Sequence, residues 1–137
     1  MSPDNLLALD VGDRRVGVAV ASMQARLPQV LTTLQRGPEF WQQLLAILDN
    51  EQIGQIVIGL PTGLNGQTTG QTDATHLFVE ELKQHTDLPT SLQDEALSSV
   101  RAKEELQKRG KDYVKGDVDA LAATYILEDY LHGASNG

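Results

Sequence analysis

The sequence predicts an α/β protein in which a five-stranded mixed sheet carries helices on both faces. Three short apolar, β-branched segments follow one another near the start of the chain, which indicates an antiparallel meander. Strand-like and helical patterns then alternate, which indicates parallel pairing. With 137 residues, the chain is expected to form a single domain over residues 1–137.

A hairpin is expected to supply the first two strands. The segments Leu6–Val11 and Arg15–Ala21 are rich in apolar and β-branched residues, and Gly12 and Asp13 between them predict a tight turn. Gln29–Leu34, in which β-branched residues alternate with others, is predicted as the third strand. These segments would form the meander.

A strand–helix–strand unit completes the expected sheet. Pro38 is predicted to open a helix, because the apolar residues after it recur at helical spacing: Phe40, Trp41, Leu44, Leu45 and Leu48. Gln55–Leu60 (QIVIGL) predicts a short buried strand, and the right-handed crossover rule places it parallel to the first strand. The other expected elements are a Gly-rich loop at residues 61–70, a helix to about His85, a strand over Pro89–Gln93, a helix over about Ser99–Arg109, a last helix over Val118–His132 and a frayed tail at 133–137.

The composition excludes several classes of protein. The chain contains no cysteine, so it forms no disulfide or thiolate metal site, which fits a reducing cytoplasm. It has no apolar run long enough for a transmembrane helix, and its first residues do not resemble a signal peptide. We therefore expect a cytoplasmic protein with no membrane partner. The formal net charge of −8 argues against a protein that is basic throughout and binds nucleic acid.

Acidic residues stand where ligands gather in such sheets, at the carboxyl ends of strands. Asp10 lies near the end of the first strand, and Asp94 and Glu95 lie at the end of the fifth. Asp119 stands near the start of the last helix, where Asp117 is better placed to act as the helix cap. Asp119 instead heads the stripe of residues expected to face the core: Ala122, Ala123, Ile126 and Tyr130.

Three carboxylates at one end of a sheet predict a divalent metal site. Like charges held close together repel, and a divalent cation relieves that repulsion. Hard oxygen ligands suit Mg²⁺ or Mn²⁺. Two such ions about 3.5–4 Å apart can hold the attacking water and the leaving oxygen of a phosphodiester in line. Asp10 is therefore predicted to be a metal ligand.

Four motifs, DVGDRRVGVAV, GLPTGLNG, DEALSS and KGDVDALAATYIL, occur in an order that resembles the YqgF-type proteins of bacteria. This family is also called RuvX or Holliday-junction-resolvase-like and belongs to the ribonuclease H-like superfamily. The resemblance implies a ribonuclease H-like fold and a metal-dependent nuclease that matures the 5′ end of the small-subunit ribosomal RNA precursor. Holliday junction resolution is the older proposal for the family.

The resemblance also assigns roles to individual residues. It places the acidic triad of the family at Asp10, Glu95 and Asp119, as catalytic residues and metal ligands. Adjacent strand residues point to opposite faces, so either Glu95 or Asp94 is expected at the site. Whether Asp117 joins it stays open. Arg15 matches a basic residue of the first motif and is expected to contact phosphate, with an ordinary surface arginine as the alternative. Lys115, which precedes Asp119 in the last motif, is likewise expected to contact phosphate, with an ordinary surface residue as the alternative.

The motif DEALSS departs from the family pattern, which usually reads Asp-Glu-Arg-Leu-Thr-Thr. Here Ala96 stands in place of the arginine, and two serines replace the threonines. If that arginine contacts phosphate, its loss removes a charge-assisted hydrogen bond. Weaker binding or turnover than in the rest of the family is then expected.

A basic segment lies directly before Asp119. Residues 101–115 contain six basic and three acidic residues. The basic residues in the second half of this segment are Lys108, Arg109, Lys111 and Lys115. The segment is predicted to bind the nucleic-acid backbone, and a solvated helix face with internal charge pairs is the alternative.

The alternatives for the whole chain concern its substrate and its activity. The expected partner is nucleic acid, either structured RNA of the ribosomal precursor or branched DNA. A catalytically weak nucleic-acid-binding or ribosome-associated protein is the third possibility, which Ala96 and the acidic charge favour. A monomer or a weak homodimer is expected.

Overall fold

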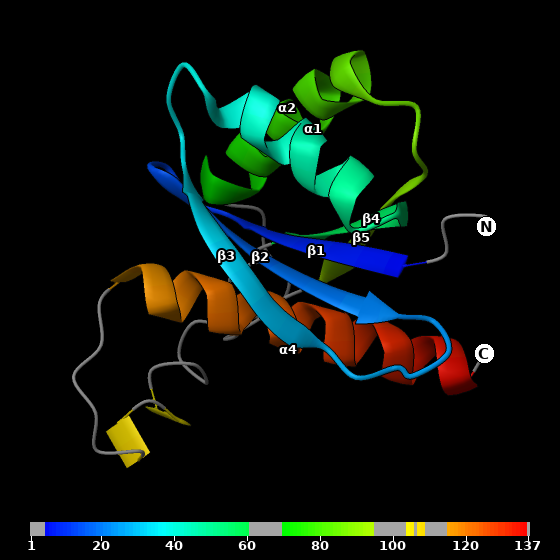
Figure 1. The fold of residues 1–137 in the computed structure, drawn as a ribbon. Helices are drawn as coiled ribbons and strands as arrows, with labels where there is room; N and C mark the ends of the chain where they lie inside the picture. The colour runs from blue at the N-terminus through cyan, green and yellow to red at the C-terminus, as the bar shows by residue number, and fades with distance from the viewer. Residues whose placement is uncertain (1–4, 61–69, 95–103, 106, 109–114, 137) are drawn as a thin grey trace.

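A computed structural model of the protein describes residues 5–60, 70–94, 104–105, 107–108 and 115–136. In this part of the chain, five strands form one sheet in the order β3-β2-β1-β4-β5, with α1 and α2 above it and α4 below it (Figure 1). The predicted mixed sheet with helices on both faces is therefore confirmed. The elements are β1 (Asn5–Val11), β2 (Arg15–Ser22), β3 (Gln29–Gln35), α1 (Phe40–Asn50), β4 (Ile53–Leu60), α2 (Gly70–His85), β5 (Thr90–Asp94) and α4 (Lys115–Asn136).

The pairing of the strands follows the prediction. β1 pairs antiparallel with β2, and β2 pairs antiparallel with β3, so the first three strands form a meander. β4 lies parallel to β1, as the crossover rule requires, and β5 extends the sheet parallel to β4. The carboxyl ends of β1, β4 and β5 consequently lie at the same end of the sheet.

The boundaries of some elements differ from the prediction. β5 begins at Thr90 rather than Pro89, because proline has no N–H to donate to a neighbouring strand. Helix α4 extends beyond the predicted Val118–His132 at both ends, from Lys115 to Asn136. No proline interrupts these flanking residues, so every backbone N–H remains available to the helix. Of the helix expected over Ser99–Arg109, four residues are described, and all are helical: Glu104, Glu105, Gln107 and Lys108.

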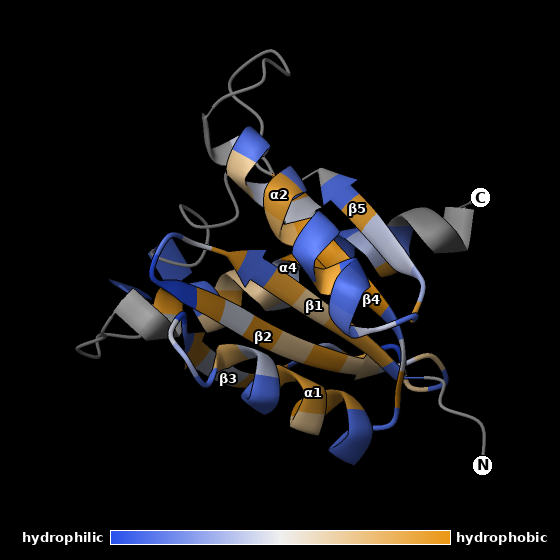
Figure 2. Ribbon diagram, turned by 90° about the horizontal axis from the view of Figure 1, so that it is seen from above, coloured by the Kyte–Doolittle hydropathy of each residue, from blue (hydrophilic) through white to orange (hydrophobic). Residues whose placement is uncertain are grey.

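Alternating side chains divide the core into two layers. The layer between the sheet and α1 and α2 contains Leu7, Leu9 and Val11 of β1, together with Phe40, Leu44 and Phe78 from the helices. The layer between the sheet and α4 contains Leu6, Ala8, Ala19, Val57, Ala123, Ile126 and Leu127. Figure 2 shows the apolar segments of β1, β2 and β4 beneath the two upper helices.

Hydrogen bonds of the Gln55 side chain connect the elements on the lower side of the sheet. The Gln55 side chain donates hydrogen bonds to the hydroxyls of Ser91, at 2.7 Å, and Tyr130, at 2.8 Å. It therefore ties β4, β5 and α4 together, and it satisfies polar groups that are costly to bury alone. None of the helices in the described ranges combines the length and apolar character needed to span a membrane.

Candidate active site

Asp10 is the next-to-last residue of β1 and faces the layer that α4 covers. In β1, Leu6 and Ala8 belong to the lower layer, so the two-residue period of the strand places Asp10 on the same side. Its side chain is half-buried and has interactions within the protein. The carboxylate at the end of the first strand therefore lies between the sheet and α4.

Gly17 lets α4 approach the sheet at this point. In the register of β1 and β2, Gly17 lies directly opposite Asp10. A Cβ atom added at Gly17 would lie 2.7 Å from the backbone nitrogen of Ala120, and closer still to the carbonyl group of Asp119. The backbone of α4 thus packs directly on the backbone of β2, and it brings Asp119 to the strand that pairs with Asp10.

Gly17 is the site residue that sequence reasoning missed. A glycine inside an otherwise continuous strand often marks a close approach of another backbone, so the signal was present in RVGVAV. The sequence could not show which element makes that approach. The same contact explains why Asp119 lies at the sheet although it is only half-buried.

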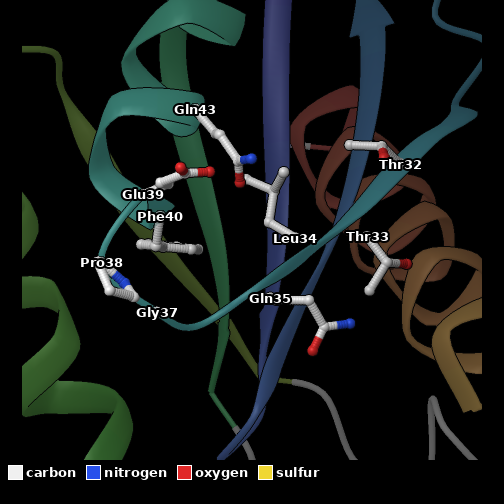
Figure 3. A pocket seen from close by; sticks show the side chains of 9 residues that line it. All are labelled: Thr32, Thr33, Leu34, Gln35, Gly37, Pro38, Glu39, Phe40 and Gln43. Atoms are coloured by element: carbon white, nitrogen blue, oxygen red, sulfur yellow. The ribbon is translucent and has the colours of Figure 1, made fainter.

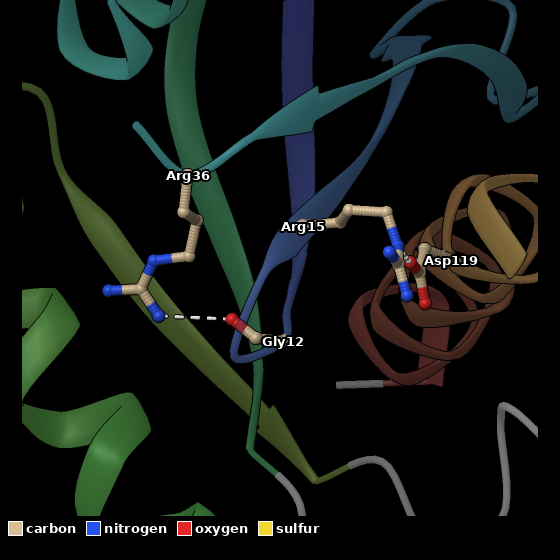
Figure 4. Close-up of polar contacts among 4 residues, drawn as sticks. All are labelled: Gly12, Arg15, Arg36 and Asp119. Carbon is tan, nitrogen blue, oxygen red and sulfur yellow. Dashed lines mark hydrogen bonds and ion pairs between the residues drawn. The ribbon is translucent and has the colours of Figure 1, made fainter. Parts of the chain in front are cut away.

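Arg15 and Asp119 form an ion pair. The Nε–H of Arg15 donates to Oδ2 of Asp119 over 3.2 Å, and the two side chains are 22% and 20% exposed. In β2, Arg15 lies two residues before Gly17, so both face α4. Figure 4 shows the guanidinium group against the Asp119 carboxylate. Arg15 is therefore mostly buried and paired with Asp119, and its expected contact with phosphate stays a prediction.

A pocket of about 550 Å³ opens beside this ion pair. It is lined by the hairpin turn and by the start of α4: Gly12, Asp13, Arg14, Arg15 and Asp119. Two guanidinium groups and two carboxylates therefore surround one opening. Such a pocket suits an anionic group that approaches together with a cation.

The hairpin turn is braced from the opposite side. Inside the turn, the N–H of Gly12 donates to the carbonyl of Arg15 over 2.9 Å. The Arg36 guanidinium donates a hydrogen bond to the Gly12 carbonyl over 3.0 Å (Figure 4). The backbone N–H of Arg36 donates to the Arg14 carbonyl over 2.8 Å. The Arg36 guanidinium also lies 5.5 Å from the ring centre of Phe78, which is buried in the upper layer. The turn is thus connected to the core.

A second pocket, of about 540 Å³, lies between β3 and the start of α1 (Figure 3). Its lining is Thr32, Thr33, Leu34, Gln35, Gly37, Pro38, Glu39, Phe40 and Gln43. Glu39 is the one ionisable side chain in that lining, so this pocket offers no cluster of charges for phosphoryl chemistry. We therefore assign the candidate active site to the pocket at the hairpin turn.

Three residues predicted for the site, Glu95, Arg109 and Lys111, lie outside the described part of the chain, and so does Ala96. Asp94 is the last residue of β5, where its backbone pairs with Leu60. Lys108 is exposed, and Lys115 begins α4, two residues before Asp117. The described residues alone contain no group of three acidic or histidine side chains placed to hold a metal ion. The metal-binding triad of Asp10, Glu95 and Asp119 thus stays a prediction as a whole.

The arrangement of strands and helices defines the fold class of the protein. A meander followed by parallel strands, with α4 across the other face, is the ribonuclease H-like architecture. The chain superimposes on RuvC of T. thermophilus, solved in complex with a Holliday junction, with a TM-score of 0.58 and 14% identity over 97% of this chain and 96% of that one. It also matches a Fowlpox virus resolvase with a TM-score of 0.55 and 7% identity, over 95% of this chain and 98% of that one. At these identities, the likeness shows the fold.

The chain belongs to the RuvX family, described as Holliday junction resolvase, whose model matches residues 4–133. It is 33% identical over 135 residues to a Chloroflexus aurantiacus protein named "Putative pre-16S rRNA nuclease", covering 96% of this chain and 88% of the relative. It is 36% identical over 130 residues to a protein of the same name from Maridesulfovibrio salexigens, covering 92% and 96%. The family resemblance read from the motifs is therefore confirmed, and the chain is a member of a nuclease family.

Proposed function

We propose that this protein is a metal-dependent nuclease that hydrolyses a phosphodiester bond near the 5′ end of pre-16S ribosomal RNA. The names of the relatives support this substrate. The observation that carries the proposal is the approach of α4 to β2 at Gly17, which brings Asp119 to the strand that pairs with Asp10. In this proposal, Asp10, Glu95 and Asp119 are the catalytic residues.

The donor set fits a divalent metal ion. Asp10 and Asp119 supply hard carboxylate oxygens from β1 and α4, and Gly17 leaves no side chain between the strand and the helix. Mg²⁺ is the ion we propose, with Mn²⁺ as a substitute of similar preference. When bound there, such an ion would activate water and stabilise the charge on the leaving oxygen. Glu95, the residue that follows β5, would supply the third carboxylate.

Basic residues would hold the phosphate backbone. Arg15 lines the pocket beside Asp119, and Lys115 begins the helix that carries Asp119. Lys108 is exposed, and we propose that it acts with Arg109 and Lys111 as the main electrostatic contact. Because the whole chain carries a net charge of −8, such local contacts must overcome its repulsion of a polyanion.

We propose that the protein acts in the cytoplasm, because a chain without cysteine does not need an oxidising compartment to form disulfides. The proposed partner is a structured RNA, and the proposed oligomeric state is a monomer or a weak homodimer.

A second candidate substrate is a four-way DNA junction, which the description of the family favours. Both substrates place a phosphodiester at the same acidic residues, so the site chemistry is shared.

The test compares cleavage of a pre-16S RNA 5′ leader with cleavage of a four-way DNA junction, at equal low salt with Mg²⁺. The wild type is expected to cleave the RNA, whereas Asp10→Asn and Asp119→Asn are each expected to abolish cleavage and to keep the fold, because the partly exposed ion pair that Asp119→Asn breaks contributes at most about 1 kcal/mol. Asp49→Asn, on the exposed side of α1, is the matched control for the loss of one negative charge and should cleave as the wild type does.

Three outcomes would contradict the proposal in different ways. Cleavage of the junction alone would replace the RNA substrate with branched DNA. Wild-type rates in both site variants would remove Asp10 and Asp119 from the catalytic set. Binding without cleavage of either substrate would favour the catalytically weak binding protein that Ala96 suggests.

A further inference from the structure

The ion pair between Arg15 and Asp119 involves a carboxylate that the proposed function assigns to a metal ion. We propose that Arg15 is an exchangeable counter-ion that couples metal binding to phosphate binding. It pairs with Asp119 while the site lacks a metal ion, and it moves to a nucleic-acid phosphate when a divalent cation takes the carboxylate. This inference rests on the proposed function and adds an order of events to it.

The backbone holds Arg15 within reach of Asp119. Its carbonyl accepts the Gly12 N–H that closes the turn, and its Cα pairs with Gln35 in the register of β2 and β3. The close contact at Gly17, two residues further along β2, holds α4 against the same strand. Arg15 therefore changes partner by rotating its side chain, while its backbone stays in place.

A guanidinium and a divalent cation compete for the carboxylate of Asp119. Oδ2 of Asp119 accepts the hydrogen bond from Arg15 at 3.2 Å. A cation that binds this carboxylate would come within a few ångströms of the guanidinium, where two positive charges repel. With the side chains only 22% and 20% exposed, solvent screens this repulsion incompletely. Arg15 therefore weakens metal binding in the absence of nucleic acid.

The displaced guanidinium has a new partner close by. The pocket of about 550 Å³ at the turn is lined by Arg15 itself, together with Gly12, Arg14 and Asp119. A phosphate that enters this pocket beside the metal ion offers two oxygens, which match the planar donors of arginine. Once Arg15 binds phosphate, it no longer competes for Asp119. Metal and nucleic acid must then each raise the affinity for the other, because such coupling is reciprocal.

The test uses Arg15→Gln, with Arg14→Gln as the matched control. Both substitutions remove one positive charge from the lining of the same pocket, but Arg15 is the residue of the ion pair. Ca²⁺ is the metal probe, because it is expected to bind without supporting rapid cleavage. Calorimetry measures the Ca²⁺ affinity of the protein alone, and fluorescence polarisation measures the affinity for the labelled RNA leader with and without Ca²⁺.

Arg15→Gln is expected to bind Ca²⁺ roughly two- to fivefold more tightly than Arg14→Gln, which is the range for breaking a partly exposed ion pair. The factor by which Ca²⁺ strengthens RNA binding should be smaller in Arg15→Gln than in the wild type and in Arg14→Gln. Thermal unfolding of all variants checks that the fold is kept. Asp119→Asn should lose Ca²⁺ affinity whether or not Arg15 is present.

Equal Ca²⁺ affinity in the two arginine variants, or an unchanged coupling factor in Arg15→Gln, would overturn the exchange. In that case Asp119→Asn would still weaken Ca²⁺ binding, and the proposed metal site would stand. If Asp10→Asn and Asp119→Asn both bind Ca²⁺ as the wild type does, the proposed metal site itself is wrong, and the exchange fails with it.

Discussion

Replacing Gly17 with alanine is expected to push α4 away from the sheet at the candidate active site. The added Cβ would lie 2.7 Å from the backbone nitrogen of Ala120, and closer still to the carbonyl group of Asp119. Favourable non-bonded contacts lie at about 3.5–4 Å, so the start of α4 must move by at least about 1 Å. Because the opposing atoms belong to the backbone, no side-chain rotation can relieve the clash.

The displacement is expected to affect both stability and catalysis. Overpacking of this kind costs about 1–3 kcal/mol of unfolding free energy. For a chain of this size, that corresponds to a decrease in melting temperature of about 4–12 °C. A 1 Å misplacement of a catalytic group can cost about 100-fold in rate. Thermal unfolding and Mg²⁺-dependent cleavage of the RNA leader measure the two effects separately.

Gly37→Ala is the matched control for the added methyl group. A Cβ added at Gly37 would meet no atom within 4 Å, so this variant should keep wild-type activity. It should also keep or slightly raise stability, by up to about 1 kcal/mol, because alanine restricts the unfolded chain. Wild-type stability and rate in Gly17→Ala would refute the view that this contact places Asp119. A loss of stability at an unchanged rate would mean that catalysis does not depend on that placement.

Three further predictions concern the metal ion and the basic residues. Ca²⁺ should support RNA binding but little cleavage, because it prefers longer bonds and looser geometry than Mg²⁺, and equal turnover with both ions would contradict the two-metal mechanism. Ala96→Arg should tighten RNA binding by up to about 1.5–3 kcal/mol in polarisation titrations, because it restores the arginine of the family motif. No change would mean that other residues contact the phosphate that this arginine would bind. Neutralising Lys108, Arg109 and Lys111 together should weaken binding to all RNA sequences. In polarisation titrations at several salt concentrations, the slope of the log binding constant against log salt concentration should fall by up to about one unit per lost phosphate contact. An unchanged affinity and slope would identify this segment as a solvated helix face.

Much of the fold could be predicted because its signals are local. Apolar and β-branched segments define β1 and β2, and Gly12 with Asp13 marks the turn between them. The parallel placement of β4 follows from the handedness of the crossover, which depends on chain chirality rather than on particular contacts. The acidic residues near the ends of β1 and β5 indicate metal chemistry in the same way, from residue type and position alone.

Contacts between distant segments could not be predicted from these patterns. Arg15 and Asp119 are separated by 104 positions, and periodicity shows which face a side chain occupies but not which element covers that face. The brace from Arg36 to Gly12 depends likewise on how β3 returns beside the hairpin.

The sequence by itself determined the main elements, the meander and the parallel place of β4 beside β1, and it predicts the acidic site, because residue type and spacing act locally along the chain. Only the tertiary structure decided that Asp119 lies at β2 and pairs with Arg15. The physical reason is steric. Gly17 has no side chain, so the backbone of α4 can approach there more closely than it can at any position that bears a Cβ.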